Sequence, residues 1–461
     1  MRSCRRLSFI CALGLIAWST NTQARSLTME QAVALAVKNS KAVAKAEQQL
    51  VELEATRKST RGAFLPKLKV SANVFVWDDV IPFDLSDLGL LLETLWNQHP
   101  DLGQLPAMEM GNIRDRVTSQ VTVTIAQPLT PLWQIAEGYS AIKYGQRAAK
   151  KAVNKSRLDV AADARRAYIQ LRQAQAGVGI AKDAVKQVEA QLKVVRAFHK
   201  AGLMGKNDVL KVEVGLARAK GAVVQTQAGE ELAQAALAIT LGLSSDEALV
   251  AAQSFGEPSA GGPRFGAYLA KAYKQRPMLG AVKDQQAAAK AQTRAAKAGL
   301  IPQIVAVANY QRTDGQGFGV QKNVFFAGGT LNWSFDWGSD YYKIDAAKSK
   351  VRRAELDEKL LRDGIFLQVK QAYLALRTAY QQLTIAKVAV KQAEEAYRIE
   401  KSKYEQSSAT TTDLLNAQLA LNRARLTENN ARYGWHIARS ELRRVTGAPI
   451  DDKTRNSKEV N

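Results

Sequence analysis

Apolar and polar residues alternate in four stretches of the chain, and strict alternation predicts β-strands with one apolar and one polar face. In the first stretch, the apolar positions from Leu68 to Val76 alternate with a polar set that includes Lys67, Lys69 and Asn73. Aromatic residues gather near the strand ends, as in the aromatic girdle of a membrane barrel. The four predicted strands are residues 67–77, 117–127, 303–311 and about 323–335.

The length of these strands suits a membrane, although it does not require one. Ten residues at about 3.3 Å each, tilted by about 45°, rise about 23 Å, which matches the apolar band of an outer-membrane barrel. The same pattern also fits a soluble antiparallel sheet. Four strands are too few to close a barrel, since the smallest usual barrel has about eight. If they span a membrane, several chains must pool their strands, because an open sheet edge is not tolerated in lipid.

The rest of the chain has the pattern of long helices. Two proline-free stretches, 132–257 and 303–448, carry apolar residues at helical spacing, and within 178–195 the spacing alternates between three and four, as in a coiled coil. Near the start, Thr28 with Gln31 three residues later has the spacing of a capping box. The predicted elements are helices over 27–62 and 138–201, a turn over 202–205, a helix that ends at Gly242, and a second turn at 406–409.

The chain also repeats itself. The segment 167–208 returns as 372–413 at one offset of 205 residues, without a gap. Upstream, 62–66 returns more loosely as 298–302 at an offset of 236. We therefore expect an internally duplicated fold with an extra segment in the first half. The predicted divisions are a signal peptide over 1–24, a first repeat over 25–257, a second repeat over 258–447 and a polar tail over 448–461.

The amino-terminal segment has the pattern of a secretory signal peptide. Arginines precede the apolar run 7–18, and Thr22 and Ala24 stand at the −3 and −1 positions of a cleavage site after residue 24. Cys4 and Cys11, the two cysteines of the chain, lie in this segment, so we expect no disulfide in the mature protein. The remaining sequence has no run of 18 apolar residues, so the mature chain is expected to be soluble after export or to enter a membrane as strands.

Composition adds a strong positive charge. The chain has 461 residues, with 65 Lys and Arg against 43 Asp and Glu, and a net charge of +22. Such a charge allows an acidic partner such as nucleic acid or an anionic surface. In 138–242, however, the bases are spread along the predicted helices and lack the aromatic interleaving of a groove that binds single strands. We therefore expect no nucleic acid partner.

Few residues are available for catalysis or metal binding. The chain has 3 His and 2 Cys, which leaves little scope for a His/Cys metal site or a Cys–His nucleophile. His99, His199 and His436 are far apart in sequence, and we assign them no role. Gly315, Gly317 and Gly319 form a flexible turn, since no helix follows them to bind phosphate. We expect no enzyme activity, cofactor or metal.

Several motifs, in order, resemble the TolC-like outer membrane efflux proteins. The opening from Leu27 to Ala32 looks like that family's first helix, and Phe64-Leu65-Pro66 precedes the first strand as it does there. The segments 201–209 and 404–417 look like the family's two periplasmic hairpin tips. The resemblance covers essentially the whole mature chain and includes the duplication. It rests on the order and spacing of the motifs, because each motif alone is weak.

The resemblance implies a mainly α fold with a β-barrel portion. Three chains would give a 12-stranded transmembrane barrel, four strands per chain, continued by a long periplasmic α-helical barrel. It also implies an exit channel in the outer membrane, for efflux or type I secretion, that opens at a periplasmic tip gate. The implied partners are a homotrimer, a periplasmic adaptor, an inner-membrane pump of RND or ABC type, and outer membrane lipid.

The resemblance also implies site residues at the tips. Asp208 and Asp413, with Asn416 and Tyr404, would form the constriction, where crowded carboxylates attract cations and acquire raised pKa values. The alternative for both aspartates is helix capping after a turn. Asn416 stands where the family often has a second aspartate, and Ala409 stands where a basic residue can tie the closed state. We expect weaker cation block and looser closure. The implied adaptor-docking residues are Gly202, Leu203, Ser407 and Ser408.

Two points stay open at the level of sequence. The acidic segment 78–116, with eight acids and two bases, reads either as an outer-surface loop with a short helix or as a plain solvated loop. The alternative to the channel is an exported basic coiled-coil protein that binds anionic cell-envelope polymers. If the channel is right, the positive charge predicts a basic duct wall or outer surface.

Overall fold

The computed structural model describes most of the chain. The described residues are 25–82, 93–98, 101, 112–245, 247–259, 262–317, 320–334, 336, 338–406 and 408–448. The predicted signal peptide, Cys4, Cys11, His99, Ser407, nearly all of the predicted tail and much of the acidic loop fall outside them. Within these ranges, no helix is both long and apolar enough to span a lipid bilayer.

The structure divides into two compact units. We call residues 45–154 and 277–363 the sheet unit, and the remainder the helical unit. Each sequence repeat contributes elements to both units, so the compact units do not coincide with the predicted repeats. The repeat boundaries themselves stay predictions.

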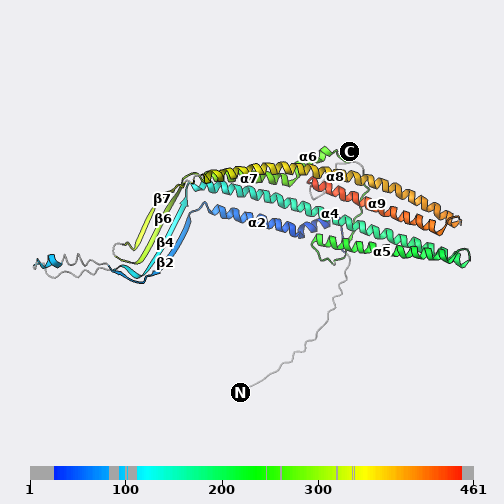
Figure 1. Cartoon of the computed structure of the whole chain (residues 1–461), viewed down its shortest axis with the longest axis horizontal. Helices are drawn as coiled ribbons and strands as arrows, with labels where there is room; N and C mark the ends of the chain where they lie inside the picture. Colours follow the sequence, from blue (N-terminus) through cyan, green and yellow to red (C-terminus); the bar gives the residue numbers. More distant parts are fainter. Residues whose placement is uncertain are drawn as a thin grey trace, which may run out of the picture. The chain divides into compact units, whose positions relative to one another are not determined.

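The sheet unit contains the four predicted strands (Figure 1). The strands are β2 (Lys67–Val76), β4 (Asn112–Pro128), β6 (Gln303–Gln316) and β7 (Asn323–Asn332). They pair antiparallel in the order β2-β4-β6-β7, and a short strand, β3 (Ile81–Pro82), pairs with β4. β4 and β6 are longer than predicted. The predicted fourth strand ends at Asn332, and Phe335 lies outside the described residues.

Strand register gives the sheet one continuous apolar face. Leu68 lies opposite Ile125 and Val70 opposite Val123, while Tyr310 pairs with Phe325 on the other two strands. These side chains have nothing packed over them: Val70 is 62% exposed and Phe325 71%. Apolar surface of this extent is left uncovered only where a partner or lipid takes it.

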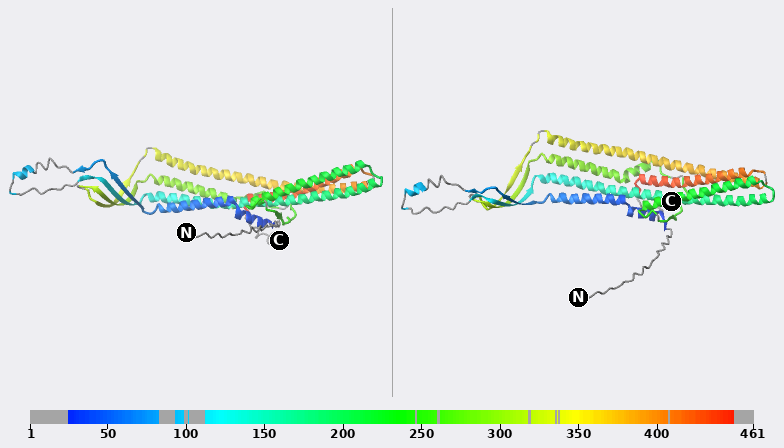
Figure 2. Two further views of the ribbon diagram at one scale, coloured as in Figure 1. Left: turned by 90° about the horizontal axis from the view of Figure 1, so that it is seen from below. Right: turned by 60° about the horizontal axis from the view of Figure 1, so that its bottom comes forward.

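Four helices complete the sheet unit, and Figure 2 shows them running alongside one another. α2 (Lys41–Gly62) leads into β2, and α7 (Pro277–Ala298) leads into β6. The first parts of α4 (Pro131–Lys200) and α8 (Ser339–Glu405) follow β4 and β7. At about 1.5 Å per residue, α4 is about 105 Å long.

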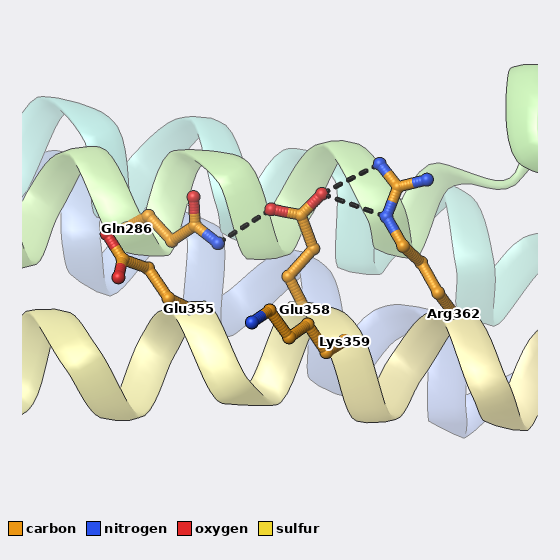
Figure 3. A pocket seen from close by; sticks show the side chains of 5 residues that line it. All are labelled: Gln286, Glu355, Glu358, Lys359 and Arg362. Carbon is orange, nitrogen blue, oxygen red and sulfur yellow. Dashed lines mark hydrogen bonds and ion pairs between the residues drawn. The ribbon is translucent and has the colours of Figure 1, made fainter.

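Polar contacts hold α7 against α8 (Figure 3). The Gln286 amide on α7 donates to the Glu358 carboxylate at 2.7 Å, and Arg362 donates to the same carboxylate at 2.8 Å. Glu355 and Lys359 line the same hollow, which has a volume of about 340 Å³. The Gln286–Glu358 hydrogen bond joins the two helices beside this hollow, and the Glu358 carboxylate is already paired.

The helical unit holds the remaining helices. These are α1 (Met29–Asn39), α5 (Lys206–Leu241), α6 (Phe265–Gln275), α9 (Thr411–Val445), and the later parts of α4 and α8. Two short parallel strands, β1 (Arg25–Leu27) and β5 (Leu249–Ala251), lie beside α1. The buried core here includes Ala164, Leu171 and Leu237 around Tyr168, whose hydroxyl donates to the Leu27 carbonyl at 2.8 Å.

The first predicted helix is two helices. Thr28 forms the predicted capping box with Gln31, but Leu27 belongs to β1 and the helix stops at Asn39. Ser40 has extended backbone (ψ 118°), and its hydroxyl accepts from the Val43 N–H at 3.3 Å, so it begins a new helix. Ser and Asn favour such breaks because their side chains compete for backbone hydrogen bonds.

Glycine allows the helix ends to meet. The Gly242 backbone ends α5 in the left-handed region (φ 68°), and the Asn39 amide donates to the Leu241 carbonyl at 3.1 Å. A Cβ on Gly242 would lie 2.8 Å from Asn39 Cβ. Gly447 (φ 70°) ends α9 in the same way against Gln275. Gly242 and Gly447 are related by the offset of 205, and Asn39 and Gln275 by the offset of 236. The structure therefore carries the duplication seen in the sequence.

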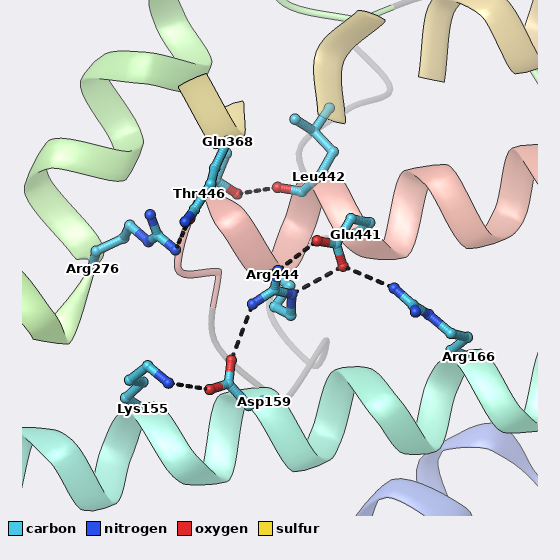
Figure 4. Close-up of polar contacts among 9 residues, drawn as sticks. All are labelled: Lys155, Asp159, Arg166, Arg276, Gln368, Glu441, Leu442, Arg444 and Thr446. Atoms are coloured by element: carbon cyan, nitrogen blue, oxygen red, sulfur yellow. Dashed lines mark hydrogen bonds and ion pairs between the residues drawn. The ribbon is translucent and has the colours of Figure 1, made fainter. Parts of the chain in front are cut away.

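An ion-pair network joins α4 to the end of α9 (Figure 4). The Arg444 guanidinium donates to Glu441 at 2.9 Å and to Asp159 at 3.2 Å, and Lys155 donates to Asp159 at 2.6 Å. Arg166 lies 3.4 Å from Glu441. The Arg444 hydrogen bonds hold the pKa of Glu441 below its usual range. These partly buried pairs fix the register of the two helices.

We predict that Gly242→Ala destabilises the protein. The left-handed backbone alone costs an alanine about 1–2 kcal/mol, and the contact with Asn39 adds to that. Gly229→Ala on the same helix is the control: a Cβ there meets nothing within 4 Å, so it should be neutral or stabilising by up to about 1 kcal/mol. Urea unfolding measures both. Equal midpoints for the two variants would contradict the junction.

Candidate functional site

The candidate site is the pair of hairpin tips in the helical unit. One tip joins α4 to α5 and the other joins α8 to α9 (Figure 1). Both turns lie where the sequence predicted them. They are the places that the resemblance to efflux channels assigned to gating and docking.

Gly202 makes the first turn possible. Its N–H donates to the His199 carbonyl at 3.0 Å and the Leu203 N–H donates to the Phe198 carbonyl at 2.9 Å. With Gly202 at φ 74°, this is the Schellman ending of a helix. The His199 ring adds a link, with Nδ1 2.8 Å from the Met204 carbonyl oxygen. The motif leaves Leu203 73% exposed at the apex of the turn.

The second turn is closed differently. The Ser408 N–H donates to the Lys403 carbonyl at 2.9 Å, and the Ser408 hydroxyl donates to the same oxygen at 3.0 Å. Ser407 lies outside the described residues. The two tips therefore present different surfaces, a bare leucine on one and a serine engaged with the backbone on the other.

The two aspartates have different local partners. Asp413 forms a capping box with Thr410: its carboxylate accepts the Thr410 hydroxyl at 2.7 Å and the Thr410 N–H at 3.1 Å. Asp208 makes no cap and lies 3.6 Å from Lys211. The capping alternative is thus seen for Asp413 and not for Asp208.

The local partners of Asp413 lower the pKa of its carboxyl group. Hydrogen bonds from the Thr410 hydroxyl and backbone N–H hold the pKa of Asp413 below its usual range. The raised values expected for crowded carboxylates refer to several chains together, and the single chain does not test them. Asp413 and Asn416 are both exposed and lie three residues apart on α9.

Tyr404 packs between the tips. It is 3% exposed, within a cluster that includes Val195, Val209 and Leu414. Its hydroxyl donates to the Met204 sulfur at 3.3 Å, and burial raises the pKa of that hydroxyl. Tyr404 therefore joins the second hairpin to the first, whereas the resemblance placed it at the constriction; its role in gating stays a prediction.

Ion pairs brace each hairpin below its turn. Arg196 on α4 pairs with Glu213 on α5 at 2.6 Å, and Glu394 on α8 pairs with Arg425 on α9 at 2.9 Å. These pairs are partly exposed to solvent, so each contributes little stability, about 1 kcal/mol or less.

Sequence reasoning missed three of these residues. The spacing from Thr410 to Asp413 is itself a capping-box signal and would have revealed the cap. Lys211 stands three residues after Asp208 on a helix, which is also a readable pairing. Nothing in the sequence marks Met204, because its contact with Tyr404 joins residues 200 positions apart.

Solved structures of outer-membrane channels share this fold. The chain matches VceC of Vibrio cholerae with a TM-score of 0.72 and 16% identity, covering 92% of this chain and 97% of that one. It matches the CmeC channel of Campylobacter jejuni with a TM-score of 0.72 and 16% identity, over 91% and 85% of the two chains. It matches the MtrE channel of Neisseria gonorrhoeae, in its open state, with a TM-score of 0.71 and 18% identity, covering 92% of this chain and 89% of that one.

The sequence comparisons match a family over part of the chain. Residues 268–448 match the model of the outer membrane efflux protein family. A stretch of 115 residues is 27% identical to the alkaline protease secretion protein AprF of Pseudomonas aeruginosa and spans 24% of each chain. The resemblance to TolC-like outer membrane efflux proteins is confirmed, and with it the assignment to the outer membrane. The matched CmeC and MtrE structures are outer membrane channels, which agrees with the prediction that this chain is not an enzyme.

We predict that Tyr404→Ala loosens the tips. Removing a buried aromatic side chain costs about 3–5 kcal/mol, whereas Tyr404→Phe keeps the packing and loses one weak hydrogen bond, for about 1 kcal/mol or less. Hydrogen exchange of the amides at 195–209 and 404–414 measures the effect. Exchange in the alanine variant that matches the wild type would show that the two tips do not depend on this contact.

Proposed function

We propose that this protein is the outer membrane exit channel of a tripartite efflux or type I secretion system. It works as a passive conduit that three chains form together. The observation that carries the proposal is the sheet of four long strands and the short β3, with an uncovered apolar face and no strand beyond β2 or β7 among the described residues. Three such sheets supply 12 strands, enough to close a barrel, and the closed barrel leaves no unpaired edge in lipid.

The same proposal assigns the hairpin tips to the periplasm. There an adaptor and an inner-membrane pump, of RND or ABC type, dock and open the conduit. Leu203 and Gly202 are the docking residues that the fold favours, because the turn holds the leucine outward. The name of the relative AprF describes a protease secretion protein, which favours secreted protein as cargo.

The channel is preferred over an exported coiled-coil protein that binds anionic polymers. A coiled coil alone gives no reason for a sheet with an exposed apolar face. Cell fractionation separates the two functions: a channel floats with outer membranes as a heat-modifiable trimer, and a polymer-binding protein stays in the soluble or wall fraction as a monomer. Recovery in the soluble fraction would overturn the proposal.

Deletion of the gene is expected to remove one transport activity. If the cargo is protein, secreted proteins disappear from the medium while drug sensitivity stays unchanged; if the cargo is small molecules, sensitivity rises instead.

A Leu203→Asp variant expressed in the deletion strain should restore the protein level but not the transport, because a charge at the exposed apex opposes apolar docking. Its control is Leu232→Asp on the exposed side of α5, away from the tip. Full transport by the Leu203→Asp variant would exclude this leucine from docking.

We predict that the closed tip is leaky. Ala409 in place of a base removes a charged tie of the closed state, and Asn416 in place of a second aspartate weakens the carboxylate ring that would block cations. Purified wild-type protein in a planar bilayer should therefore show basal conductance, and Asp208→Asn with Asp413→Asn should weaken block by divalent cations. Complete absence of basal conductance in the wild type would contradict the loose tip.

A further inference from the structure

The polar face of the sheet carries charge of one sign. In the rows where all four strands pair, residues 67–72 of β2 lie beside 121–126 of β4, 307–312 of β6 and 323–328 of β7. The polar face of these rows contains two charged residues, Lys67 and Lys69. The register sets Lys67 in a row with Ala126, and Lys69 in a row with Thr124 and Asn309.

No carboxylate of the described residues is paired with either lysine. Within the described part of the chain, neither Lys67 nor Lys69 has an ion pair, and both side chains are exposed. Their neighbours behave differently: Lys58 on α2 pairs with Glu54, and Arg312, on the opposite face of the sheet, pairs with Asp314 at 3.0 Å. The two lysines are thus the uncompensated charges of this part of the sheet.

Closure of the barrel would concentrate that charge. This step rests on the proposed function, in which the apolar face meets lipid and the polar face lines the lumen. Three chains then contribute six ammonium groups in two rings about 7 Å apart along the strand. That spacing is below the Debye length of about 8 Å at physiological ionic strength, so the fields of the two rings overlap. Rings of basic side chains in a pore favour anions.

We propose that Lys67 and Lys69 form an anion-attracting ring in the barrel lumen, near the start of β2. The ring makes the barrel favour small anions and the carboxylate or phosphate groups of anionic cargo. It acts separately from the aspartates of the tips, which favour cations. The proposed channel then has charged rings of opposite sign at two places, and its ion preference reflects both.

The test separates the two kinds of charged ring. The full-length protein is recorded in planar bilayers under a KCl gradient, in a background of Asp208→Asn and Asp413→Asn that removes the tip aspartates. This background channel should prefer chloride over potassium. Lys67→Gln with Lys69→Gln should lower the chloride-to-potassium permeability ratio at least about threefold, and Lys67→Glu with Lys69→Glu should reverse the preference.

Arg312→Gln is the matched control. It removes a positive charge from the same sheet but from the opposite face, so the permeability ratio should stay unchanged. A ratio that is the same in the background channel and in the Gln and Glu variants overturns the lysine ring, while the conductance itself still supports the proposed channel. A protein that gives no conductance in any variant overturns the channel, and the ring with it.

Discussion

The hydrogen-bonding demand of one small sheet constrains the whole molecule. β2 and β7 each pair on one side, and the apolar face that they share with β4 and β6 has no cover. In lipid, every unpaired backbone N–H or C=O costs several kcal/mol, so such a sheet persists there only as part of a closed barrel. The outer-membrane assignment and the open edges of this sheet, among the described residues, are the reason for proposing that several copies assemble.

Duplication explains how one chain supplies both halves of its architecture. α1 and α6 have the same length and the same offset of 236 as α2 and α7, and their ends meet the glycine-capped ends of α5 and α9. Both junctions need a left-handed residue without a Cβ. The same glycine junction therefore occurs in both halves of the chain. The hairpin tips differ between the halves: Gly202 forms the first turn, and a Thr410 capping box follows the second.

Patterns of local origin were predictable from the sequence. Strand alternation, the heptad seam, the glycine helix ends and the Thr28 cap depend on residues within a few positions of one another, and the structure contains all of them. The break at Ser40 was not predicted, because the helical pattern runs through it and the junction with Gly242 decides it. The Tyr404–Met204 contact and the Arg444 network were also out of reach, since their partners lie far apart in sequence.

The position of charge matters more than its total. The net charge of +22 first suggested an acidic macromolecule, yet many of the bases are paired along the helices, as Arg196 and Arg444 are. Charges affect transport where low-dielectric walls focus the field and no counter-charge lies nearby. By that criterion, in the proposed channel, the two lysines of β2, which have no ion pair among the described residues, matter more than the paired bases of the helices. In the proposed trimer, selectivity is a property of the assembly, although the place of each proposed ring follows from the register of a single strand or helix.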